Sequence, residues 1–233
     1  MRKTLVASPA FFFLLAALLA AQTAPEVEIT AEPSHHLLLQ NRDVRVFSLE
    51  LAPQASTRTH RHRHDHVFIA LGVAEVSNLV SGRPPERQKL QDGAATFVSG
   101  GFAHQLRNLG STPFRGVSIE LLQAQKSPPA KWEEERGLEI LEGGTQDILF
   151  VKDGVRVSEI DLQPGGTLPA NKSAPRRLLV AVSDVDLLSH SGGKTSMARH
   201  LRAGEVAWMM GGAVPALMNA GKGQAKFIVL EFH

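Results

Sequence analysis

Residues 43–53 read DVRVFSLELAP, and residues 154–164 read GVRVSEIDLQP. The first valine of the two stretches lies at positions 44 and 155, which gives an offset of 111 residues. The same offset, without a gap, pairs identical residues to the far end of each copy: Gly82 with Gly193, Gly93 with Gly204, Asn108 with Asn219, and Glu120 with Glu231. Because chance matches do not keep one register through strands and turns, we infer that the chain is an internal duplication.

Each copy has the pattern of an all-β unit. Short segments of alternating or continuous apolar character are typical of strands, and the first copy contains four: 44–51, 66–76, 94–98 and 115–122. Clusters of Gly, Pro and Ser separate them at 81–85, 99–101 and 109–113. Strands at this spacing predict a small antiparallel barrel or sandwich in each copy.

The N-terminus has the layout of a secretory signal. Arg2 and Lys3 precede an apolar run from Leu5 to Ala21, and small residues follow. We therefore expect residues 1–24 to be a signal peptide and the protein to be exported, most simply to a bacterial periplasm. An uncleaved membrane anchor is the alternative, since a membrane span needs about 20 apolar residues.

Composition excludes several classes of function. The chain contains no cysteine, so disulfides and thiol chemistry are excluded. The formal net charge is only +2, and no block of like charges indicates nucleic acid or a membrane surface as partner once the signal is removed. A small-molecule ligand or substrate is the expected partner.

Histidines are concentrated in the first copy. His60, His62, His64 and His66 alternate with other residues, and His104 follows. Side chains two apart in a strand share a face, so this spacing can direct several imidazoles inward. Neutral imidazole is the commonest ligand of transition metals. The alternative is an exposed, His/Arg-rich basic loop that binds metal only adventitiously.

Two longer stretches favour the metal site. Residues 53–66, PQASTRTHRHRHDH, resemble the first motif of the cupin superfamily, which runs Gly, five residues, His-x-His, three or four residues, Glu, six residues, Gly. Residues 93–108, GAATFVSGGFAHQLRN, resemble the second: Gly, five residues, Pro-x-Gly, two residues, His, three residues, Asn. In the second motif only the proline differs, replaced by Ser99. The resemblance covers roughly residues 30 to 233 and implies two tandem cupin jelly-roll β-barrels.

The resemblance also implies one divalent transition metal, and the residues do not distinguish Fe(II), Ni, Zn, Mn and Cu. Carried over by position, its ligands are His60, His62 and His104, with His66 in the place of the family's glutamate. That histidine departs from the motif, and the following glycine, Gly72, arrives one residue early. Beside the ligands, we expect His64 on the turn between strands, with a role as a further ligand as the alternative. Asp65 is expected to be a solvated turn residue, and the alternative is an outer residue that orients a ligand or acts as a base.

The second copy lacks these ligands. At the offset of 111, the four positions are Asn171, Ser173, Arg177 and Pro215, none of which is a good ligand for a transition metal. We expect a barrel without a metal site that serves for packing, homodimer formation or ligand recognition. Arg177 points to an anion in its cavity or to a structural salt bridge.

The predicted domains are therefore a signal peptide (1–24), a metal-binding barrel (25–125), a linker (126–137) and a metal-free barrel (138–233). His35 and His36 lie outside the motifs, and we expect them on the surface. The resemblance favours a non-haem metal-dependent dioxygenase acting on a small organic substrate, with no catalytic acid or base assigned. The alternatives are a non-catalytic exported module that binds a sugar or an organic acid, and a metal-assisted isomerase or hydrolase.

Overall fold

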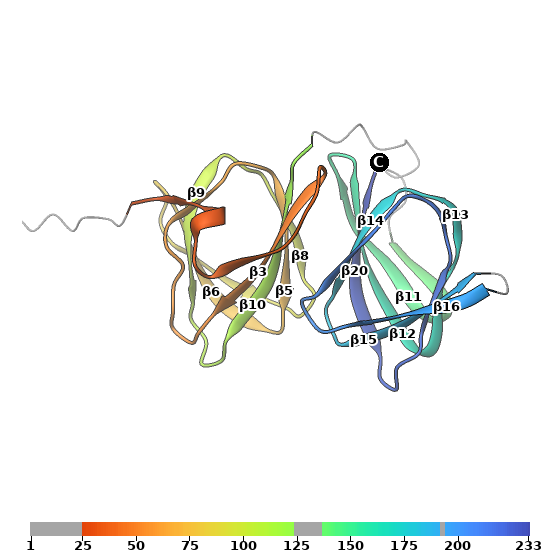
Figure 1. The fold of residues 1–233 in the computed structure, drawn as a ribbon. Helices are drawn as coiled ribbons and strands as arrows, with labels where there is room; N and C mark the ends of the chain where they lie inside the picture. The colour runs from red at the N-terminus through yellow and green to blue at the C-terminus, as the bar shows by residue number, and fades with distance from the viewer. Residues whose placement is uncertain (1–24, 124–136, 192–193) are drawn as a thin grey trace, which may run out of the picture.

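The apolar segments of the sequence form strands, and the strands form two β-barrels that lie side by side (Figure 1). The computed structural model describes residues 25–123, 137–191 and 194–233. Within these ranges the helical structure is one short 3-10 turn, η1 (Ile29–Ala31). The all-β prediction is confirmed. The predicted signal peptide, and the predicted linker up to residue 136, lie outside the described residues.

The first barrel consists of two five-stranded sheets. The outer sheet has the strand order β1 (Val27–Glu28), β4 (His60–His62), β9 (Phe102–Asn108), β6 (Ala74–Val80) and β7 (Glu86–Leu90). The inner sheet has the order β2 (His35–Gln40), β3 (Val44–Leu51), β10 (Phe114–Leu121), β5 (His66–Leu71) and β8 (Ala95–Val98).

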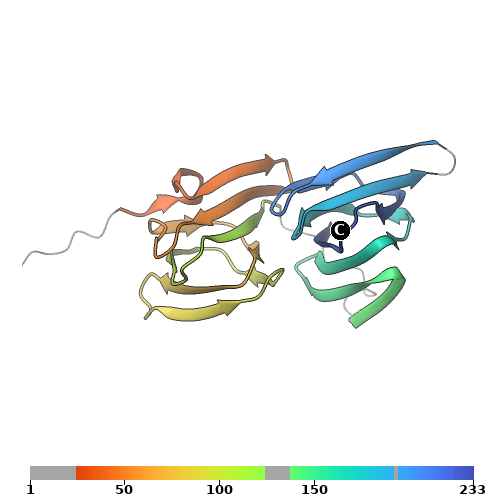
Figure 2. The same cartoon turned by 90° about the horizontal axis from the view of Figure 1, so that it is seen from below.

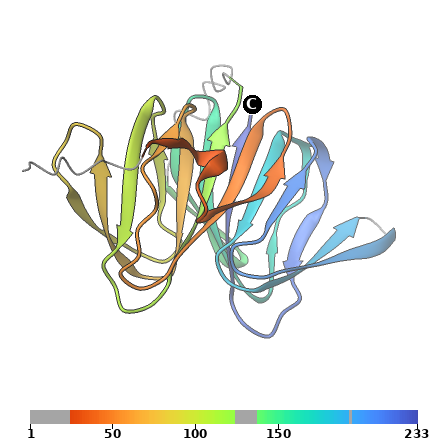
Figure 3. The same cartoon turned by 60° about the vertical axis from the view of Figure 1, so that its left-hand side comes forward.

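The second barrel repeats this plan with a larger main sheet. Its order is β16 (Lys194–Leu201), β15 (Val185–Ser191), β19 (Ala216–Asn219), β12 (Val155–Leu168), β20 (Ala225–Phe232), β14 (Arg176–Ala181) and β17 (Val206–Met209), with β11 (Gly137–Lys152) paired to β12. A small sheet joins β13 (Asn171–Ala174) to β18 (Gly212–Val214). The β15–β16 hairpin projects from this barrel (Figures 2 and 3).

Successive side chains along the strands of the inner sheet point alternately into two different apolar cores. In β3, Val44 and Val46 belong to an apolar core that also contains Val157 and Leu230 of the second barrel. Leu49, on the opposite face, packs inside the first barrel. The period of two in a strand explains this division. The sheet β2-β3-β10-β5-β8 therefore packs against β12, β20 and β14, and the two barrels share one buried core.

Polar contacts reinforce the contact between the barrels. The Arg176 guanidinium lies 2.5 Å from the carboxylate of Asp43, which is buried. Arg115 donates a hydrogen bond to the Ala203 carbonyl oxygen at 2.7 Å. Such pairs orient the barrels, while the apolar core supplies most of the stabilisation.

One predicted strand is divided in the structure. Residues 66–76 form parts of β5 and β6, which belong to different sheets, and the chain turns at Gly72. Gly72 has a φ of 86°, which only glycine adopts without strain, and its amide donates to Asp92 Oδ1 at 2.6 Å. The sequence does not reveal this turn, because the residues on both sides of Gly72 are apolar and read as one continuous strand.

No helix among the described residues combines the length and apolar character that crossing a bilayer would require.

Candidate metal centre

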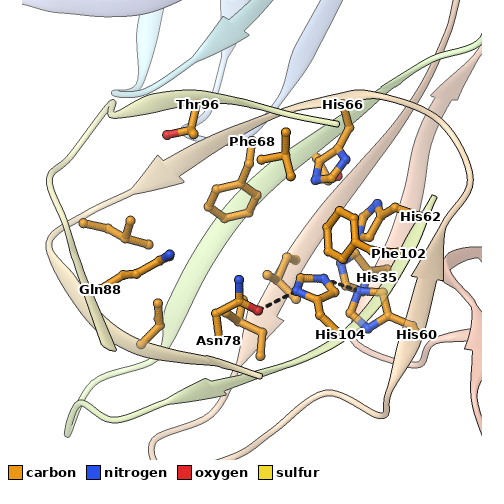
Figure 4. A pocket seen from close by; sticks show the side chains of 16 residues that line it. His35, His60, His62, His66, Phe68, Asn78, Gln88, Thr96, Phe102 and His104 are labelled. Carbon is orange, nitrogen blue, oxygen red and sulfur yellow. Dashed lines mark hydrogen bonds between the residues drawn. The ribbon is translucent and has the colours of Figure 1, made fainter. Parts of the chain in front are cut away.

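Strand pairing places two of the predicted ligands next to each other. In the antiparallel pair β4–β9, His60 lies directly opposite His104, so both rings leave the sheet on the same face. Their Nε2 atoms are 3.1 Å apart, and their ring centroids 4.5 Å. Two strands far apart in sequence thus bring together one histidine from each motif (Figure 4).

The opposite ring nitrogens fix how these two histidines are protonated. His60 Nδ1 donates to the Arg58 carbonyl oxygen at 2.9 Å, and His104 Nδ1 donates to Asn78 Oδ1 at 2.8 Å. Because both partner atoms are acceptors, each Nδ1 carries the proton and each Nε2 carries a lone pair. Two lone pairs at 3.1 Å repel each other unless a cation lies beside them.

His62 completes a group of three imidazoles. Ligand nitrogens of His60, His62 and His104 lie within 4.8 Å of one another. His62 is two residues from His60 on β4 and shares its face, as the alternation predicted. Phe102, opposite His62 on β9, stacks on its ring at 5.9 Å and covers the group.

Burial keeps these rings neutral. It lowers the pKa of His60 from its ordinary value of 6.5 to about 4, and it lowers those of His62 and His104 well below that ordinary value. Neutral imidazole is the form that binds metal, so the three imidazoles would not need to lose a proton to bind an ion at neutral pH.

His66, the predicted fourth ligand, is buried near the three but lies outside the compact group. Its ring stacks on that of His62 at 4.0 Å with an angle of 15° between the planes. It comes from β5, in the other sheet, and desolvation lowers its pKa to about 4. Its Nδ1 has no hydrogen-bond partner among the described residues.

The buried carboxylate of Glu120 lies close to both His62 and His66. Glu120 is directly opposite His66 on β10, and burial raises its pKa, although Arg45 at 3.3 Å opposes the shift. Glu120 Oε1 lies 4.0 Å from His62 Nδ1, another buried nitrogen without a hydrogen bond in the described part of the chain. The carboxylate is therefore close enough to orient His62 after a small movement.

His64 and Asp65 lie between β4 and β5 and do not line the cavity of the site. Asp65 Oδ1 accepts a hydrogen bond from the Gly100 amide at 2.7 Å, which ties two turns together. His64 is on the turn, as expected. The structure thus gives Asp65 a contact with backbone, while its predicted role toward a ligand stays a prediction.

His35 corrects an expectation from the sequence. Only 4% of its side chain is exposed, whereas His36, predicted with it to be on the surface, is exposed. The His35 ring lies 4.8 Å from that of His60, and its Nδ1 donates to the buried carboxylate of Glu32 at 2.8 Å. A Glu-x-x-His spacing around the 3-10 turn was the signal in the sequence that could have identified this pair.

These histidines form one wall of a cavity of about 200 Å³ (Figure 4). Its other walls are mainly apolar: Leu49, Phe68, Val76, Leu90, Val98, Phe102 and Leu106. Four neutral polar residues complete it: Asn78, Gln88, Thr96 and Ser118. Among the described residues that line it, none is a carboxylate, lysine or arginine.

The second barrel has different chemistry at the matching positions. Arg177, in the place of His66, binds Glu231 Oε1 at 2.6 Å, and Arg156 binds the other oxygen of the same carboxylate at 2.5 Å. Of the two alternatives for Arg177, the structure therefore contains the salt bridge. Apolar residues dominate the interior of this barrel, including Ile160, Leu162 and Phe227.

Comparison with known proteins shows the fold. No family model and no curated protein sequence matches the chain. AerE from Microcystis aeruginosa superimposes with a TM-score of 0.60 at 11% identity, over 87% of this chain and 98% of that one. A variant of oxalate decarboxylase from Bacillus subtilis gives 0.60 at 11% identity, over 88% and 76%. A further structure of that decarboxylase, from a study of its Mn(II) centres, gives the same values. The chain has the cupin fold.

Within this cupin fold, the donor atoms fit a transition-metal ion. Metal–nitrogen bonds of about 2.1 Å place neighbouring ligands of a six-coordinate ion roughly 3 Å apart, which matches the two Nε2 atoms of His60 and His104 at 3.1 Å. A set of neutral nitrogens suits zinc, copper, iron and nickel better than calcium or magnesium. The three histidines can therefore hold one such ion at the cavity wall.

Proposed function

We propose that this chain is a metal-dependent cupin enzyme, a non-haem dioxygenase acting on a small organic substrate. The observation that carries the proposal is the pair of facing lone pairs, His60 Nε2 and His104 Nε2 at 3.1 Å, beside an apolar cavity. Three protein ligands leave positions on the ion for substrate and oxygen.

Each residue of the site has a definite task in this proposal. His60, His62 and His104 hold the ion, and Arg58 and Asn78 keep the first and last of them in the metal-binding tautomer. The bound ion supplies Lewis-acid and redox chemistry. Because all three ligands are neutral, the full charge of the ion remains available to polarise a substrate.

The lining indicates the class of substrate. Phe68 and Phe102 exclude water from the space next to the histidines, and Leu90 and Val98 continue the apolar wall. A cavity of about 200 Å³ admits only a small molecule. We propose a largely apolar substrate with two adjacent oxygen atoms, such as a catechol or a diketone, whose oxygens can bind the ion.

The protein is also proposed to be exported. Arg2, Lys3 and the apolar run that follows support a signal peptide, and the lack of cysteine is compatible with any redox environment. The metal is proposed to be one of Fe(II), Ni, Zn, Mn and Cu. Since the similar decarboxylase has Mn(II) centres, manganese and oxalate belong in the panels of metals and substrates to be tested.

The experiment measures metal binding first and turnover second. The metal-free chain is titrated with each metal by calorimetry, and oxygen consumption is then followed with catechols, diketones and oxalate. We expect one equivalent of metal to bind, and His62→Ala and His104→Ala to abolish that binding. His36→Ala is the matched control, because His36 is exposed and should leave both measurements unchanged. Unchanged metal content in His104→Ala would contradict the site.

A non-catalytic binding module is the second candidate. It is favoured by the absence of any carboxylate among the described residues that line the cavity, because several kinds of turnover need such an acid or base. In that case the metal binds as above and a ligand binds to it, but oxygen consumption stays flat with every metal and substrate. Catechol binding, followed by its absorbance, without any oxygen consumption would favour the binding module over the dioxygenase.

A further inference from the structure

The second barrel contains a cavity of its own, of about 300 Å³. Twelve residues line it, and eight of them lie 111 residues after residues that line the histidine cavity. Leu179 takes the place of Phe68, Ala213 that of Phe102, and Pro215 that of His104. The second barrel therefore has a cavity at the same position as the first, but its lining residues contain no histidine that could bind a metal.

The walls of this cavity favour an apolar ligand. Pro215 has no ligand atom where His104 has an imidazole, and Ala213 leaves open the space that the Phe102 ring fills in the first barrel. Met197, Met209 and Met210 line part of the remainder, while the Trp208 ring packs on Phe232 on the opposite face of β17. Methionine gives an adaptable, polarisable surface that suits aliphatic and aromatic groups.

One positive charge borders this apolar space. Arg199, on β16, lines the cavity at the position of Gln88 and is half-buried. Across the described ranges of the chain, its side chain forms no hydrogen bond and no ion pair. Two other arginines of this barrel, Arg156 and Arg177, are already paired with Glu231. A guanidinium without a partner can give a carboxylate two parallel charge-assisted hydrogen bonds.

We propose that the second barrel is a metal-free binding site for a small apolar carboxylate, in which Arg199 binds the carboxylate and the methionine-lined cavity holds the apolar body. The volume lies at the small end of known ligand pockets and fits a short fatty acid or a single aromatic ring. This site is independent of the chemistry of the first barrel, because no histidine contributes to it.

Hexanoate is a suitable probe, with hexanol as its uncharged counterpart. The full chain, freed of metal with a chelator, carries Trp132→Phe so that Trp208 is the single remaining tryptophan. Hexanoate should change the Trp208 fluorescence saturably. Arg199→Gln should weaken hexanoate binding about tenfold or more while leaving the weaker binding of hexanol unchanged.

Three further variants test the position of the ligand. Ala213→Phe restores the ring found in the first barrel and should block both probes, whereas Arg202→Gln, at an exposed arginine nearby, should change neither. His62→Ala should also leave hexanoate binding intact. The proposal is overturned if hexanoate does not bind, if hexanol binds equally tightly, or if Arg199→Gln or Ala213→Phe binds hexanoate as the parent chain does.

Discussion

At the scale of single residues, the site depends on which nitrogen of each imidazole holds the proton. Arg58 uses its backbone carbonyl for His60, so a side-chain substitution there leaves this hydrogen bond in place. Asn78 uses its side chain for His104, and that contact can therefore be removed by mutation. The contribution of tautomer control to metal affinity is measurable at this one position.

Asn78→Ala should lower metal affinity by about 10- to 100-fold, because His104 loses the acceptor that orients its ring and keeps Nε2 unprotonated. Calorimetric titration of the metal-free variant measures the change. Gln88→Ala is the matched control: Gln88 lines the same cavity, and its side chain has no hydrogen bond to a ligand histidine. Equal affinities for Asn78→Ala and the parent chain would show that the hydrogen bond has no role in binding.

Buried neutral histidines also make the metal-free protein sensitive to acid. The pKa of His66 is about 4 in the folded chain and 6.5 without the protein environment, so the unfolded state binds more protons between these values. The stabilising contribution is complete above pH 6.5 and is lost as pH falls toward 4, on the order of 3 kcal/mol in all. Thermal unfolding of the metal-free chain against pH should show a smaller acid loss in His66→Gln. Identical pH profiles for the two proteins would contradict the lowered pKa.

Sequence patterns predicted that His60, His62 and His104 lie together, but they did not predict that His35 lies beside them. His60 and His62 lie on β4 and His104 lies on β9, and these two strands, one from each motif, pair directly. His35 comes near them only because β2 pairs with β3 and the Glu32 turn directs its ring inward, which depends on long-range register. His66 follows the alternation of its neighbours, but the chain changes sheet between β4 and β5, so that alternation does not fix its position.

At the scale of strands and turns, the similarity of the two barrels is clearest in a pair of asparagines at matching positions, Asn108 and Asn219. Asn108 donates to the Leu51, Ala52 and Thr112 carbonyl oxygens and accepts from the Gly110 amide. Asn219 repeats this pattern: its acceptors are the Leu162 and Gly223 carbonyl oxygens, and its donor is the Gly221 amide. Both side chains are buried, and each ties a turn to a strand, β3 for Asn108 and β12 for Asn219. The conspicuous asparagine of the second motif therefore has a structural role.

Asn108→Ala and Asn219→Ala should each destabilise the protein by about 1–3 kcal/mol, since buried backbone groups lose their partners. Urea unfolding measures the free energy, and metal titration shows whether the site survives. Asn219→Ala should bind metal normally, because its turn lies in the other barrel. A variant of Asn219 that loses metal at full stability would mean that the asparagine acts on the site and not on the fold.

Strand positions were predicted best where burial alternates. Residues 44–51 are a strand over their whole length, with neighbouring residues facing two different cores. The polar strand β7 (ERQKL) was not predicted, because it lies exposed at the edge of its sheet and has no alternation of apolar residues. The periodic spacing of apolar residues reflects which side chains are buried. Strands with few buried side chains are therefore hard to predict from sequence.

At the scale of the whole molecule, the two barrels share an apolar core, and we expect them to unfold as one unit. Val46, Ile69 and Ile119 of the first barrel share a core with Leu178 and Leu230 of the second. All five side chains are fully buried, so separating the barrels would expose a large apolar surface. A change that stabilises or destabilises one barrel should therefore also change the free energy of unfolding of the other.

Metal bound in the first barrel should therefore stabilise the second. Trp208 packs on Phe232 at 5.4 Å next to the shared core, and in a Trp132→Phe chain its fluorescence reports the second barrel alone. With free metal at 100 times its dissociation constant, the folded state gains about 2.7 kcal/mol, so the Trp208 unfolding midpoint should rise with metal concentration in a single transition. In His62→Ala the midpoint should not respond to metal. A Trp208 transition that ignores metal in the parent chain, while the first barrel unfolds separately, would show that the shared core does not couple the two barrels.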